Sequence, residues 1–110
     1  MERDEQKLLA GLEQSLSDTY HAARRLKPPY NPTEFRRMLL EHGAKETADR
    51  LLAAGNPSSG FTELFLRGKD NLRLSLEYVV LNGPWRALFT PQQLAIARRR
   101  LQEVDVEPPA

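Results

Sequence analysis

The sequence predicts an all-α fold: a compact bundle of about six helices, in which a long amphipathic N-terminal helix precedes a core of shorter helices. Three observations predict it. Apolar residues recur at three- and four-residue steps along most of the chain, as on the buried face of a helix. Proline and glycine fall where such segments begin and end. No two stretches read as partner strands, and a lone strand would leave its backbone groups unpaired.

The composition fits one soluble domain without redox or membrane chemistry. A chain of 110 residues with a formal net charge of +1 suits a single core. The absence of cysteine excludes disulfides, thiolate-ligated metals and thiol catalysis. The start, Met1–Glu5, is too charged for a signal peptide, and no apolar run approaches the roughly 20 residues that span a bilayer. We therefore expect a cytoplasmic protein with no membrane contact.

The first segment, residues 1–27, predicts one amphipathic helix from about Asp4 to Leu26, ended by Pro28 and Pro29. Its apolar stripe is narrow and close to a heptad. Such a stripe either docks on its own domain or pairs with a second copy of the chain. For pairing, the candidate self-association residues are Leu9, Leu12, Leu16 and Tyr20.

The helical core is predicted to span residues 28–104. Asn31, Pro32 and Glu34 have the spacing of a helix start with a capping box, and this second helix is expected to end at Gly43 in a left-handed conformation. A third helix, residues 44–54, follows directly. Ser58 or Ser59 is expected to cap a short fourth helix that ends at Gly68.

The stretch from about Asn71 to Leu81 is the one ambiguous segment, because its apolar residues fit both a strand and a helix face. Since no other stretch offers a partner strand, the prediction is a largely buried helix.

The last helix has the clearest start signal in the chain. Thr90, Pro91 and Gln93 have the chemistry of a capping box with proline at the first helical position. Trp85 and Phe89, just before it, are expected to pack against this helix, and Arg98–Arg100 are expected to point outward. The tail, residues 105–110, is expected to bury nothing and to fray.

Between about Asn31 and Leu101 the chain carries a series of short motifs with a characteristic order and spacing. They include Gly60-Phe61-Thr62-Glu63-Leu64, Leu74-Ser75-Leu76-Glu77, Trp85, Leu88-Phe89-Thr90 and Ala97–Leu101. With them the chain resembles a family of small, uncharacterised bacterial helical proteins. The resemblance implies a helical fold and assigns no activity and no catalytic residue. The chain departs from the family pattern at Gly68–Asn71, which is longer than the usual turn, and at Arg73, where the family tends to have aspartate.

The sequence offers little enzyme chemistry. Asp18 and His21 lie three residues apart on one helix face, but two donors without a third are too few for a metal site. Ser58 and Ser59 lack the glycine context of a nucleophile, and no glycine loop could cradle a phosphate. The prediction is a protein without catalytic residues, cofactor or metal, and with no pocket beyond a shallow groove near Trp85.

Nucleic-acid binding is the alternative prediction, because no acidic residue lies between Glu77 and Glu103 while several arginines do. A helix-turn-helix around Gly43 is disfavoured, since Leu39 and Asp49 occupy positions that the motif reserves for a small and an apolar residue. The candidate phosphate contacts are Arg67, Lys69, Arg73, Arg86, Arg98, Arg99 and Arg100.

The favoured prediction is a non-catalytic module for protein–protein interaction or regulation. The long first helix could extend beyond a small core with its own apolar stripe, and the Pro28-Pro29 pair could act as a semi-rigid joint. The partner is either a second copy of the chain or another protein.

Overall fold

The structure is a computed structural model, and it describes residues 2–109. All regular structure in this range is helical, which confirms the all-α prediction. None of the described helices is long and apolar enough to cross a membrane. The helices are α1 (Glu2–Ala23), α2 (Thr33–Ala53), α3 (Ser59–Leu66), α4 (Leu76–Leu81) and α5 (Pro91–Gln102), with the 3-10 helices η1 (Lys69–Leu74) and η2 (Trp85–Leu88).

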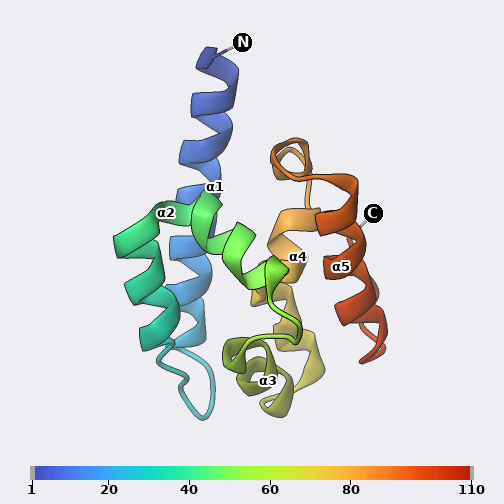
Figure 1. The fold of residues 1–110 in the computed structure, drawn as a ribbon. Coiled ribbons are helices and arrows are strands. Elements are labelled where there is room, and N and C mark those ends of the chain that lie inside the picture. The colour runs from blue at the N-terminus through green and yellow to red at the C-terminus, as the bar shows by residue number, and fades with distance from the viewer. Residues whose placement is uncertain (1, 110) are drawn as a thin grey trace.

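The first half of α2 runs back along α1, so the two form a helical hairpin joined by the loop around Pro28 (Figure 1). The first turns of α1 extend beyond the other helices. At Gly43, α2 kinks with a φ of 81°, a left-handed value that glycine adopts without steric cost. The second half of α2 then turns toward α4 and α5 (Figure 1). Gly43 therefore separates two helical segments, as the sequence predicts.

One hydrophobic core joins all five α-helices. Leu12 and Leu16 of α1 are fully buried in it, together with Leu52 of α2 and Leu101 of α5. Burying a leucine side chain contributes about 1.5–3 kcal/mol, so α1 is an integral part of this core.

The two similar helix starts behave differently. At Thr90 the predicted capping box forms: Gln93 N donates to Thr90 Oγ1 at 3.1 Å, and Thr90 N donates to Gln93 Oε1 at 3.0 Å. At α2 the prediction is wrong, because the residue before the helix is Pro32 and no side chain caps it. The Asn31 side chain instead accepts a bond from the Tyr20 hydroxyl, and Glu34 pairs with Arg37. Ser58 caps α3 as expected.

The predicted helix over residues 71–81 is broken at Ser75. Its hydroxyl donates to Leu72 O at 2.6 Å and accepts from Tyr78 N at 3.2 Å. The first bond closes η1 and the second caps α4. Serine competes with helical backbone bonds in this way, and it divides the segment into two short helices.

Two expectations about the C-terminal part are also wrong. Trp85 packs on α1, where an added Cβ at Gly11 would lie 3.1 Å from the indole Nε1. The expectation placed Trp85 on α5, but η2 lies along α1 and α4. In the tail, Val106 is partly buried against the core, and its amide donates to Leu101 O at 2.9 Å. The tail therefore folds back on the end of α5.

Candidate functional site

Arg100, predicted as a phosphate contact, lies in the interior. It is 4% exposed and donates from Nη1 to Glu77 Oε2 at 2.9 Å. The same guanidinium donates to the carbonyls of Leu51 and Ala54, which are orphaned at the end of α2. Glu77 is itself 2% exposed. The pair joins α2, α4 and α5, so Arg100 is unavailable to an external ligand.

Arg67, a second predicted contact, is also committed within the chain. Its side chain donates to the carbonyls of Pro28 and Pro29, pairs with Glu63 at 2.5 Å and lies over the ring of Tyr30. Arg67 thus fastens α3 to the loop between α1 and α2. It does not belong to a free basic surface.

The other five predicted contacts are exposed and spread over η1, η2 and α5. Two of them have partners within the chain: Lys69 Nζ donates to Asp105 O at 3.2 Å, and Arg99 lies 3.8 Å from Glu103. The five are Lys69, Arg73, Arg86, Arg98 and Arg99.

The predicted self-association stripe is mostly inaccessible. Leu12 and Leu16 are 0% exposed and Tyr20 is 8% exposed, all within one chain. Leu9 is partly buried, as is its neighbour Leu8. The heptad-like stripe of α1 therefore packs against the other helices of the same chain. Because these helices already cover it, the stripe cannot also pair with a second copy.

A groove that the sequence analysis missed runs along the α1–α2 hairpin, with Arg36 in its lining and Arg24 over the same tyrosine ring. Arg24 and Arg36 both lie over the ring of Tyr20, at 5.9 and 5.6 Å from its centroid. Among the described residues, neither arginine has a carboxylate within salt-bridge distance. Arg24 follows Tyr20 by four residues, a signal readable in the sequence, whereas Arg36 arrives only through the hairpin.

The groove has a volume of about 450 Å³, and most of the surface that lines it is apolar. Leu40, in its wall, is 75% exposed, the largest fraction among the exposed large apolar side chains. The lining residues are Ala10, Glu13, Gln14, Ser17, Tyr20, His21, Arg36, Leu39 and Leu40.

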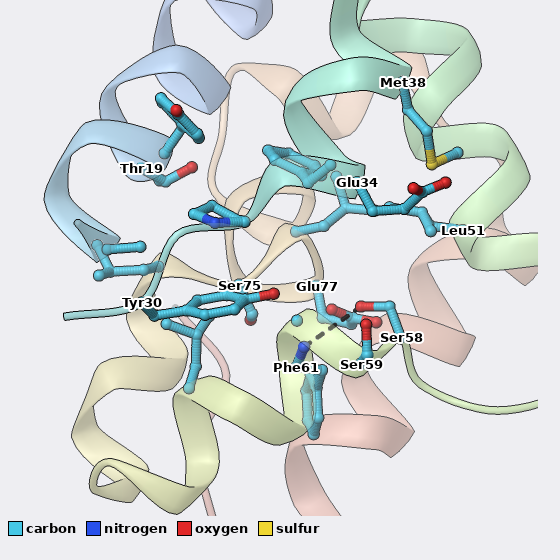
Figure 2. A pocket seen from close by; sticks show the side chains of 18 residues that line it. Thr19, Tyr30, Glu34, Met38, Leu51, Ser58, Ser59, Phe61, Ser75 and Glu77 are labelled. Carbon is cyan, nitrogen blue, oxygen red and sulfur yellow. Dashed lines mark hydrogen bonds between the residues drawn. The ribbon is translucent and has the colours of Figure 1, made fainter. Parts of the chain in front are cut away.

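A smaller pocket of about 80 Å³ opens on another side of α2, where the ends of α1, α3 and α4 meet. Figure 2 shows Ser58, Ser59 and Glu77 gathered on one side, with the Tyr30 hydroxyl turned toward them. This pocket lies away from Trp85, where the sequence analysis expected only a shallow groove. Most of its wall is apolar and comes from Ala23, Phe35, Met38, Leu51, Phe61, Leu64, Leu74 and Leu76.

Tyr30 forms part of this pocket and stays in its neutral form. Burial raises the pKa of its phenol, and the negative charge of Glu63 raises that pKa further, while Arg67 acts in the opposite direction. The hydroxyl therefore keeps its proton and remains a hydrogen-bond donor at neutral pH.

No group of three or more metal-ligating side chains occurs among residues that the structure describes. No protein-family model matches the chain, and neither the curated proteins nor the solved structures include a match. The resemblance to a bacterial helical family therefore stays a prediction.

Proposed function

We propose that the protein is a non-catalytic interaction module whose docking face is the groove of the α1–α2 hairpin. The observation that supports this most is Leu40, a large apolar side chain left three-quarters exposed beside a groove. Apolar side chains that line an exposed groove are typical of protein interaction sites. Two antiparallel helices with a groove between them offer a natural seat for a third helix.

The charges around Tyr20 favour an acidic partner, because Glu13, the carboxylate in the lining, already accepts a bond from Ala44 N at 3.0 Å. Arg24 and Arg36 flank Tyr20 without carboxylate partners in the described part of the chain, and His21 lies edge-on to the same ring. A helix with an apolar ridge beside glutamate or aspartate would bury Leu40 and neutralise these cations. Charge complementarity of this kind speeds association and fixes orientation.

Self-association is a separate part of the proposal. With Leu12, Leu16 and Tyr20 buried, the side chains of α1 left for contact with a second copy are Leu8 and Leu9, which are partly exposed. Analytical ultracentrifugation over a range of protein concentrations measures the oligomeric state. A dimer that is lost in Leu9→Asp supports this route, and a monomer at every concentration contradicts it.

The docking face is tested with a fluorescent, acidic amphipathic helical peptide. We expect the affinity of the peptide to fall about tenfold in each of the single variants Leu40→Ser and Arg36→Ala. We also expect added salt to weaken its binding to the unaltered protein. Leu66→Ser is the matched control, because Leu66 is 71% exposed on α3, away from the groove. No binding to the unaltered protein, or an equal loss in the control, would contradict the proposal.

Nucleic-acid binding is the second candidate and has weaker support, since Arg67 and Arg100 are used within the fold. The exposed Arg98 still lies on α5 without an ion pair among described residues. If this surface binds DNA, the affinity should fall with salt on a log–log slope of several units and should weaken in Arg98→Ala/Arg99→Ala. Absence of binding at low salt excludes it.

A further inference from the structure

The lining of the 80 Å³ pocket contains acidic side chains but no basic ones. Two carboxylates line it together with serine hydroxyls: Glu34 at the rim, which pairs with Arg37, and Glu77 inside, which pairs with Arg100 through one oxygen. The lining itself contains no lysine, arginine or histidine. Four aromatic rings also contribute: Tyr20, Tyr30, Phe35 and Phe61. Aromatic faces and carboxylates both attract cations, so the two kinds of wall favour the same ligand charge.

Glu77 is the polar group inside the pocket that lacks a full set of partners. Its side chain is 3% exposed, and Arg100 binds Oε2 alone. No donor within the described chain bonds the other oxygen, Oε1. Glu77 Oε1 is also not fully buried. Among the described residues, Thr47 Oγ1 is the only side-chain atom that is both fully buried and without a hydrogen-bond partner. Since Glu77 lines the pocket, the pocket is the route by which Oε1 can be reached.

We propose that this pocket binds a small protonated amine with an apolar body, such as an alkylammonium group. The apolar body would lie against Phe35, Met38 and Leu51, and the ammonium would donate to Glu77 Oε1. The nearby hydroxyls of Ser58 and Ser59 can accept its remaining N–H groups (Figure 2). The volume suits a ligand of about six water-sized groups.

Other ligand classes fit this pocket less well. A purely apolar ligand would cover Glu77 Oε1 without offering a donor, and an unsatisfied buried acceptor opposes binding. An anion would meet two carboxylates and no cationic side chain in the lining. The inference does not depend on the docking face, because the pocket and the hairpin groove share only Tyr20.

The test compares three ligands that differ only in the head group: n-butylammonium, n-butanol and butyrate. An aliphatic amine is protonated at pH 7, as lysine is. Chemical-shift titration of the isotope-labelled protein at fixed ionic strength gives the three dissociation constants. We expect n-butylammonium to bind about tenfold more tightly than n-butanol, butyrate not to bind, and the shifts to centre on Gly60, Phe61 and Leu76.

Two variants assign the preference to the pocket. Glu77→Gln keeps an oxygen for Arg100 and removes the charge, so the amine should lose its advantage over the alcohol. Because this variant could unfold, Phe35→Leu provides a second readout: it keeps an apolar wall and removes one ring, and it should weaken the amine more than the alcohol. Glu34→Gln, at the exposed rim, should change the ratio little. Equal affinity for amine and alcohol, a preference that survives Glu77→Gln, or shifts centred on the hairpin groove would overturn the proposal.

Discussion

Arginines in two regions of this molecule have opposite uses. Arg100 and Arg67 lie where helices end or loops turn, and each binds backbone carbonyls and one carboxylate. Arg24 and Arg36 lie on the outside of the hairpin, stacked on Tyr20 with their N–H groups free of carboxylates in the described chain. The first region stabilises the fold, whereas the second leaves its positive charge at the surface. In this molecule, the arginines drawn into the fold are those that meet backbone carbonyls at helix ends or in loops.

The largest expected effect comes from splitting the buried pair. Glu77→Leu leaves Arg100 charged in the interior, so the free energy of unfolding should fall by about 3–5 kcal/mol. Urea denaturation followed by circular dichroism measures it. Arg99→Ala, on the exposed face next in sequence, is the control and should change stability by less than about 0.5 kcal/mol. A loss below about 1 kcal/mol in Glu77→Leu would mean that Arg100 is not confined as described.

Arg67→Ala should lower the free energy of unfolding by less, about 1–3 kcal/mol. The Arg67 side chain is partly solvated, and the bonds that it loses are mainly to carbonyls. Arg67→Lys should recover little of this, since an ammonium cannot span the Pro28 and Pro29 oxygens as a planar fork does. Thermal unfolding of the two variants gives the comparison. Full recovery by lysine would show that charge alone matters at this position.

The two helix starts extend the same comparison to caps. Thr90→Ala should lower the free energy of unfolding by about 1 kcal/mol, because it removes an observed cap bond. Asn31→Ala should change it by less, since Asn31 caps no helix. Chemical denaturation of both variants distinguishes them. Equal losses would indicate that Asn31 stabilises α2 after all.

The smallest stability change is expected for Arg24→Ala and Arg36→Ala, about 0.5 kcal/mol each, because both guanidinium groups stay in solvent and an exposed cation over a ring contributes little. The same substitutions should weaken the binding of the fluorescent acidic peptide, which fluorescence anisotropy measures. A variant that loses stability and keeps binding would reverse the roles assigned to the two regions.

Much of the helical framework could be predicted from local signals. Ser58, Thr90 and Gly43 act within a few residues of themselves, so their sequence context is enough. The errors arose where a distant group competes for a side chain. Asn31 turns to Tyr20 instead of capping α2, and Trp85 finds Gly11, 74 positions earlier in the chain.

The candidate sites were harder to predict for the same reason. The run Arg98-Arg99-Arg100 gives no sign that its last member meets the carbonyls at the end of α2. The hairpin groove needs Arg36 brought beside Tyr20, and the small pocket needs Phe35, Phe61 and Glu77 from three separate helices. Spacing along the chain cannot show such meetings.

The bonds from Arg100 to Leu51 and Ala54 also set an order for folding during synthesis. The carbonyls at the end of α2 emerge from the ribosome about fifty residues before the guanidinium that binds them. Until α5 has been synthesised, the carbonyls at that end of α2 and the carboxylate of Glu77 lack the guanidinium that binds them in the folded protein. The contacts that Arg100 makes with α2 and α4 can therefore form only after α5 has been synthesised.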